Sequence, residues 1–82
     1  MRINGDHHSV IPLLMLTEGE TARVAWIDGG HGIRRRLADI GIIPGKKIGI
    51  AHGAGKGPRI VVIDETKVMV GRGMLHKIFV KL

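Results

Sequence analysis

The sequence contains no cysteine and no tyrosine, and Trp26 and Phe79 are its only large aromatic residues. The absence of cysteine excludes disulfides, thiolate metal ligands and cysteine nucleophiles. Two aromatic rings are too few to line the groove of a proline-binding SH3 domain, or to build the stacking surface of a module that binds single-stranded nucleic acid. The sequence therefore predicts an aliphatic core and argues against both of those binding functions.

Side chains that carry catalysis are also scarce. Ser9 is the only serine, and the acidic residues are scattered over predicted turns and surfaces, so the spacing indicates no nucleophile–base pair and no acid–base pair. The glycine-rich segment 53–57 lacks the spacing of a phosphate-binding loop and leads into a strand instead of a helix, so we interpret it as a long hairpin loop. We expect no enzymatic activity, no small-molecule substrate and no required cofactor.

The 82 residues carry a formal net charge of +6, with 13 Lys and Arg against 7 Asp and Glu. This excess favours acidic partners, nucleic acid or an anionic membrane face, although a solvated surface explains it equally well. No segment has the apolar run of a signal peptide or a membrane span. We therefore expect one domain with a cytoplasmic location.

Hydrophobic periodicity indicates a mainly β protein. The first residues show no sustained pattern, so we expect a flexible arm over residues 1–11 and a folded domain over residues 12–82. Ile33, Leu37 and Ile40 recur at helical spacing and predict a helix from His31 or Gly32 to Ile40. Strand formers gather in five segments, namely 21–28, 46–52, 59–63, 67–70 and 76–82. Five short strands with one short helix inserted after the first strand predict a small, strongly bent barrel.

Glycine and proline mark the turns between these elements. Gly41 stands where a helix end favours a positive φ, Pro44–Gly45 is a type II turn signal, and Gly71 and Gly73 permit a 3₁₀-like turn before the last strand. The β-branched run 59–63 suggests burial on both faces. The expected core consists of aliphatic residues of the helix and strands: Leu37, Ile40, Ile48, Ile50, Val62, Val70, Ile78 and Val80.

The ordered set of motifs resembles the FeoA family. It comprises Arg23–Val24 to Gly29–Gly30, the stretch RLADIGIIPG at 36–45, Gly57–Pro58, and Gly71–Arg72–Gly73–Met74 followed by Ile78–Phe79–Val80. The resemblance covers roughly Pro12 to Leu82. It implies an SH3-like barrel, a cytoplasmic location and a role beside FeoB, the membrane GTPase that carries ferrous iron inward.

The family is similar in turn to the C-terminal SH3-like domain of iron-dependent repressors of the DtxR type. The fold alone does not show whether such a domain acts in transport or in transcription. The sequence contains no helix-turn-helix and no dimerisation helices, which favours a transport accessory over a repressor.

The best candidate contact surface is basic. Consecutive helical positions are about 100° apart, so Arg34, Arg35 and Arg36 cannot all face the core. We expect them, together with Arg72, to bind carboxylates or phosphates of a partner, although a solvated helix face is an equally simple interpretation. Beyond this helix the sequence indicates no dense Lys/Arg stripe.

Histidine raises the question of a metal site. The spacing of the five histidines gives no helical HxxxH pair and no carboxylate cluster at ligand intervals, so we predict no metal site from His7, His8, His31, His52 and His76. The family resemblance implies at most a weak association with iron or zinc.

Three functions stay open: a regulatory module that docks to FeoB, a basic nucleic-acid-binding SH3-like module, which the low aromatic content disfavours, and a metal-dependent dimer. The oligomeric state is not predicted.

Overall fold

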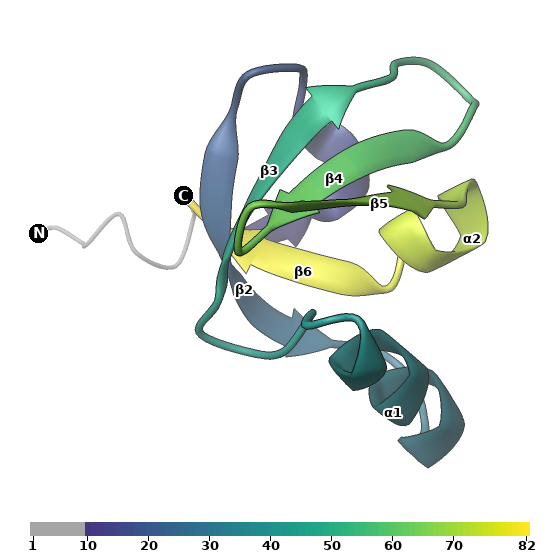
Figure 1. The fold of residues 1–82 in the computed structure, drawn as a ribbon. Helices are drawn as coiled ribbons and strands as arrows, with labels where there is room; N and C mark the ends of the chain where they lie inside the picture. Colours follow the sequence, from purple (N-terminus) through teal and green to yellow (C-terminus); the bar gives the residue numbers. More distant parts are fainter. Residues whose placement is uncertain (1–9) are drawn as a thin grey trace, which may run out of the picture.

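The computed structural model describes residues 10–82, which form one antiparallel sheet with short helical segments around it (Figure 1). The strand order across the sheet is β1-β6-β2-β3-β4-β5. The strands are β1 Val10–Pro12, β2 Thr21–Ile27, β3 Lys47–His52, β4 Arg59–Ile63, β5 Thr66–Val70 and β6 Ile78–Lys81. The helical segments are the 3₁₀ helix η2 Leu13–Met15 and the α-helices α1 His31–Asp39 and α2 Arg72–Leu75. The prediction of a mainly β, strongly bent domain is confirmed.

The sheet has six strands, so the predicted count of five is wrong. The additional strand, β1, pairs with β6 and places Val10 opposite Lys81 and Pro12 opposite Phe79. Val10 and Ile11 therefore belong to the sheet and not to a flexible arm. Three residues are too few to show alternation, and their partner lies at the other end of the sequence, so no local pattern reveals this strand. Residues 1–9 of the expected arm lie outside the described residues.

The core lies on the concave side of the sheet and is entirely aliphatic. Leu13 of η2 and Leu75 of α2 are completely buried, and η2 contacts both β6 and α2. The four-residue α2 replaces the 3₁₀-like turn that the sequence predicted for 71–75. Of the expected core residues, six are buried: Leu37, Ile48, Ile50, Val70, Ile78 and Val80.

Val62 is half-buried, which corrects its assignment to the core. In β4 the buried positions are Arg59, Val61 and Ile63, so the two alternate positions point to the outer face. Val62 lies there opposite Gly49 of β3. The unbroken β-branched run suggested burial on both faces, but the strand follows ordinary alternation.

Ile40 is 38% exposed, so its assignment to the core is also wrong. The helix ends at Asp39, and Gly41 with φ +91° turns the chain. The Gly41 N–H donates to Ala38 O at 2.9 Å and the Ile42 N–H donates to Leu37 O at 2.9 Å, which is the Schellman arrangement. The next aliphatic residue, Ile42, is therefore the one that packs in the core beside Leu37.

The other predicted turn glycines behave differently from one another. Gly45 has φ +93°, and the Lys46 N–H donates to Ile43 O at 3.2 Å, as in a type II turn around Pro44 and Gly45. Gly71 is the N-cap of α2 with φ −72°, and Gly73 lies inside that helix without a positive φ. A Cβ at Gly71 or Gly73 meets nothing within 4 Å. The backbone of α2 therefore does not require either glycine, contrary to the expectation.

Neither α-helix in the described part of the chain combines the length and apolar character that a membrane crossing requires.

Candidate functional site

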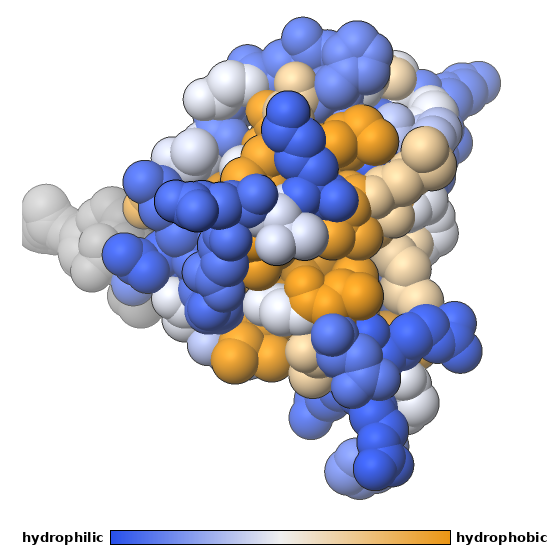
Figure 2. All heavy atoms as spheres, viewed as in Figure 1, coloured by the Kyte–Doolittle hydropathy of each residue, from blue (hydrophilic) through white to orange (hydrophobic). Residues whose placement is uncertain are grey.

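The arginines of α1 are exposed, as expected for a contact surface. Arg34 and Arg35 line a shallow hollow of about 380 Å³ together with His31 and Ala38. Arg36 is exposed but belongs to neither hollow beside α1. Among residues 10–82, no acidic side chain forms an ion pair with any of the three arginines. In Figure 2 the end of the molecule that carries α1 is covered by hydrophilic side chains, next to apolar surface.

Arg34 also borders an apolar hollow between α1 and β2. This hollow has a volume of about 330 Å³. Its residues come from β2, from α1 and from the segment between α1 and β3: Trp26, Ile27, Arg34, Ala38, Ile42, Ile43 and Pro44. We call this set the α1–β2 hollow. Trp26 is 47% exposed and Ile43 is 42% exposed, so its rim carries two large apolar side chains in contact with solvent.

Trp26 reaches this surface because β2 contains a bulge. Val24 is buried opposite Val80, but the next paired residues are Trp26 and Phe79, so Ala25 is an extra residue in β2. Strict alternation would place Trp26 on the same side as Val24, in the core. The bulge turns it to the outer face instead.

Phe79 of β6 supports the exposed indole ring. The ring centroids of Trp26 and Phe79 are 4.5 Å apart and the ring planes differ by 6°. The two rings of the sequence therefore form one stacked aromatic surface beside the α1–β2 hollow. Of the two rings, Trp26 lines the hollow, and Phe79 supports it from the neighbouring strand.

The turn after α1 shapes the floor of the α1–β2 hollow. The Schellman arrangement buries Ile42, and the type II turn then places Ile43 and Pro44 at the surface. Gly45 fixes this turn to β2, since its N–H donates to Val24 O at 2.7 Å. The predicted turn residues thus support the hollow, and the sequence offered no signal that Ile43 and Trp26 would be its exposed apolar members.

Arg72 is exposed at the start of α2 and lines neither hollow beside α1. The structure therefore brings Arg34 and Arg35 together, and it does not add Arg72 to them. Arg72 stays a predicted contact residue with no neighbouring feature that supports the role.

The histidines of the described chain do not converge. Among residues 10–82, no three side chains of His, Cys, Asp or Glu lie close enough to hold a metal ion. His52 Nδ1 lies 3.3 Å from Glu18 Oε2, which also accepts a hydrogen bond of 2.9 Å from the Gly53 N–H. His7 and His8 lie outside the described residues. The expected weak association with iron or zinc stays a prediction.

Arg59 is the buried charged residue that the sequence analysis missed. It is 4% exposed, and its Nη1 and Nη2 donate to Gly57 O at 2.7 Å and Gly55 O at 3.0 Å. Its guanidinium thus holds the hairpin loop between β3 and β4 in place. At the other end of these strands, Lys46 forms an ion pair with Asp64. Both arrangements are structural.

One carboxylate has a shifted pKa. Glu20 Oε1 accepts hydrogen bonds from the Thr17 N–H at 2.7 Å and from Thr17 Oγ1 at 3.0 Å. The backbone bond first, and the hydroxyl bond second, lower the pKa of Glu20. Glu20 is exposed in the turn before β2, so its role is to stabilise that turn.

The comparison with known proteins agrees with this fold. The FeoA domain model matches residues 11–82. A search of curated proteins finds no match to the sequence. The crystal structure of an iron uptake regulatory protein, FeoA, has a TM-score of 0.84 at 29% identity, over 88% of this chain and 96% of that chain.

Two further solved structures share the fold. The zinc-bound FeoA of Stenotrophomonas maltophilia, described as an SH3 domain protein, has a TM-score of 0.77 at 21% identity, over 87% of this chain and 89% of that chain. A manganese-dependent transcriptional repressor has a TM-score of 0.79 at 26% identity over 88% of this chain, which spans only 41% of the repressor. The bent sheet is an SH3-like barrel, and because the family model covers nearly the whole described chain, the protein belongs to the FeoA domain family.

Proposed function

We propose that this chain is a non-catalytic accessory of ferrous iron transport that acts in the cytoplasm by docking to a FeoB-type membrane GTPase. Membership of the FeoA family supports a role in iron uptake, as does the similarity to a protein described as an iron uptake regulator. The family does not fix the docking face. That part of the proposal depends on the surface of this molecule.

The α1–β2 hollow is the observation that carries the proposal. Trp and Arg are the residue types that most often dominate the binding energy of protein interfaces. Here Trp26 and Arg34 border one apolar hollow, and Ile43 adds a second exposed apolar side chain to its rim. A volume of about 330 Å³ is at the small end of ligand pockets, which suits an apolar side chain of a partner protein.

The hollow is already formed before any partner binds. Trp26 is held by its stack on Phe79, and Ile43 is held by the turn that follows the Schellman arrangement. Side chains that are already ordered lose little rotamer freedom on binding, so more of the contact energy contributes to affinity. Arg34, beside this apolar surface, is suited to a carboxylate of the partner. We therefore expect the partner to present an apolar side chain next to an acidic one.

The test is a calorimetric titration with the purified cytoplasmic GTPase domain of a FeoB protein from the same organism. Trp26→Ala and Arg34→Glu are expected to weaken binding by about 30-fold each, as for residues at the centre of an interface. Arg36→Glu is the matched control, because it makes the same change of charge on the same helix but outside the hollow. Its affinity should stay close to that of the wild type.

Two results would overturn the proposal. The first is the absence of binding by the wild-type chain under conditions in which both proteins are folded. The second is an equal loss of affinity in Arg34→Glu and Arg36→Glu while Trp26→Ala binds normally, because net charge and not the hollow would then govern the interaction.

A further inference from the structure

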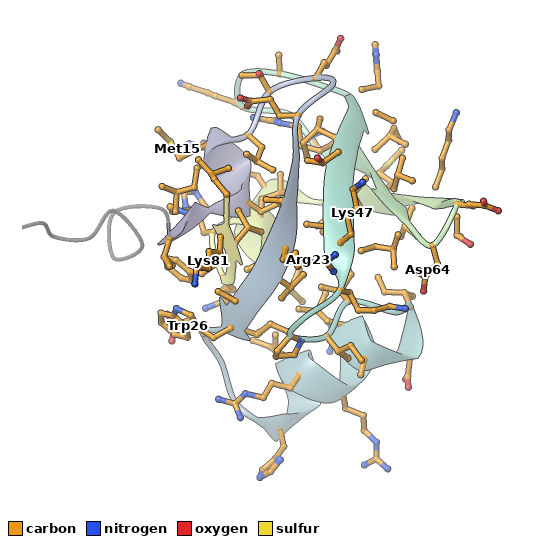
Figure 3. The ribbon with its side chains drawn as sticks, turned by 90° about the vertical axis from the view of Figure 1, so that its left-hand side faces the viewer. Met15, Arg23, Trp26, Lys47, Asp64 and Lys81 are labelled. Atoms are coloured by element: carbon orange, nitrogen blue, oxygen red, sulfur yellow. The ribbon has the colours of Figure 1, made fainter. Side chains whose placement is uncertain are left out.

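Three cations lie in one row across the outer face of the sheet. Arg23 of β2 is the register partner of Lys47 on β3 and of Lys81 on β6. Directly opposite residues of antiparallel strands project from the same face, and all three side chains are exposed. Figure 3 shows Arg23 and Lys47 on the neighbouring strands β2 and β3, with Lys81 on the other side of β2. We call these three residues the cation row; at the usual strand spacing it is about 10 Å long.

The charges of the cation row are not neutralised within residues 10–82. Its only side-chain hydrogen bond in that range joins Arg23 Nη1 to Gly45 O at 3.0 Å. Neighbouring Lys46, in contrast, is paired with Asp64. Like charges directly opposite one another destabilise an antiparallel pair, and here the repulsion occurs on both sides of Arg23. A negatively charged surface placed over the row would relieve it.

Two exposed apolar side chains lie beside the cation row. Val10 on β1 is the register partner of Lys81 and is 37% exposed. Leu82 is 65% exposed and lines a hollow of about 340 Å³ together with all three cations. Exposed cations next to exposed apolar side chains suit the interface of a lipid bilayer, because the cations stay among the anionic headgroups while the apolar side chains reach the acyl boundary.

Nucleic acid fits the same surface less well. Val10 and Leu82 would gain nothing from a phosphate backbone, whose recognition depends on charge and hydrogen bonds. Residues 10–82 also contain no Asn and no Gln, the side chains that pair with adenine edges. The apolar residues around the row therefore favour a bilayer as its partner.

We propose that the cation row, with Val10 and Leu82, binds the headgroups of an anionic lipid bilayer. Lys47 also lines a second hollow together with Glu20, Asp64 and Glu65, so we expect the anionic surface to reach no farther across the sheet than Lys47. The cation row shares no residue with the α1–β2 hollow. A test of the lipid proposal therefore gives a result that does not depend on whether the docking proposal is correct.

The test is the partition of the full chain onto phosphatidylcholine vesicles with and without phosphatidylserine. The wild type should bind only the anionic vesicles, and binding should weaken as salt is added. Lys47→Gln/Lys81→Gln should lower the partition coefficient about 10- to 30-fold. Arg23 is left unchanged because it donates a hydrogen bond to the turn at Gly45. The matched control, Arg34→Gln/Arg35→Gln, removes two charges from α1 and should bind anionic vesicles nearly as the wild type does.

Three outcomes would overturn the lipid proposal. Equal partition of the wild type onto neutral and anionic vesicles would exclude a role for the cations. Equal losses in the two double variants would indicate an effect of net charge. If Lys47→Gln/Lys81→Gln binds vesicles normally but loses affinity for a single-stranded oligonucleotide, the row is a nucleic-acid surface. The comparison of the two vesicle types uses the wild type, so it holds even if a variant is less stable.

Discussion

Trp26 and Phe79 stack face to face across the β2–β6 pair, with ring centroids 4.5 Å apart. Trp26 lines the α1–β2 hollow, whereas Phe79 does not. Phe79 therefore acts on the hollow through Trp26: it holds the indole ring against the sheet. Through this stack, the pairing of β6 with β2 determines where the Trp26 ring lies at the proposed docking surface.

The stack should be measurable as a coupling energy. In a double-mutant cycle of Trp26→Leu and Phe79→Leu, we expect an interaction energy of about 0.5–1.5 kcal/mol, the usual value of an aromatic pair beyond area burial. Urea unfolding of the wild type, the two single variants and the double variant measures this interaction energy. Phe79→Leu alone should also weaken partner binding, although Phe79 does not line the hollow. Strictly additive effects on the free energy of unfolding would show that the stack contributes nothing.

Two glycine substitutions should differ in their effects on stability. Gly41→Ala places a side chain at φ +91° and its Cβ 3.0 Å from Ile63 Cγ2, so it should lower the free energy of unfolding by about 1–2 kcal/mol or more. Gly73→Ala lies in α2 with open space around the new Cβ, and it should be neutral or stabilise by up to about 1 kcal/mol. Thermal unfolding of both variants measures the difference. A large destabilisation by Gly73→Ala would contradict this description of α2.

The buried guanidinium of Arg59 should be required for the order of the β3–β4 loop. Arg59→Met removes the hydrogen bonds to Gly55 O and Gly57 O and should cost about 2 kcal/mol of stability. Amide hydrogen exchange should accelerate across residues 53–57. Lys56→Met, which removes an exposed charge from the same loop, is the control and should change neither quantity. Unchanged exchange in Arg59→Met would show that the loop is held by other contacts.

Stability should depend on Glu20 at acidic pH. Its folded-state pKa is lowered by the hydrogen bonds from Thr17, so its contribution is present above the ordinary glutamate value of about 4.3 and is lost as the pH falls through the lowered value. Glu20→Gln should therefore lose less stability than the wild type between about pH 6 and about pH 3. Urea unfolding at both pH values, with Glu65→Gln as the control, measures this. Identical pH dependence in the wild type and Glu20→Gln would contradict the expectation.

Local sequence patterns were enough to predict the barrel and most of its buried core residues. Alternation placed Ile48, Ile50, Ile78 and Val80 inside, and the spacing of helix residues placed Leu37 inside. Ile40 was misplaced because the helix ends one residue before it, and helical spacing cannot show where a helix stops. The six buried residues follow simple periods. Val62 lies in a strand that also alternates, and it was misplaced because an unbroken β-branched run does not show which face of the strand is buried.

The candidate surfaces were less predictable, because they depend on pairing between distant strands. Trp26 faces outward only because Ala25 is a bulge, and the bulge is visible only in the register of β2 against β6. The cation row joins residues from three strands, so the sequence showed three scattered cations and no stripe. In contrast, Arg34, Arg35 and Arg36 are consecutive on one helix, and their exposure followed directly from helical geometry.

The most direct test of the docking account maps the contact on the unmodified chain. In a titration of the isotope-labelled protein with the FeoB GTPase domain, amide and indole signals are followed by NMR. The account predicts that the largest shifts occur in the α1–β2 hollow, at the Trp26 indole, Ala38 and Ile43. Shifts confined to the β4–β5 hairpin at Asp64 and Glu65, with the hollow unaffected, would contradict it.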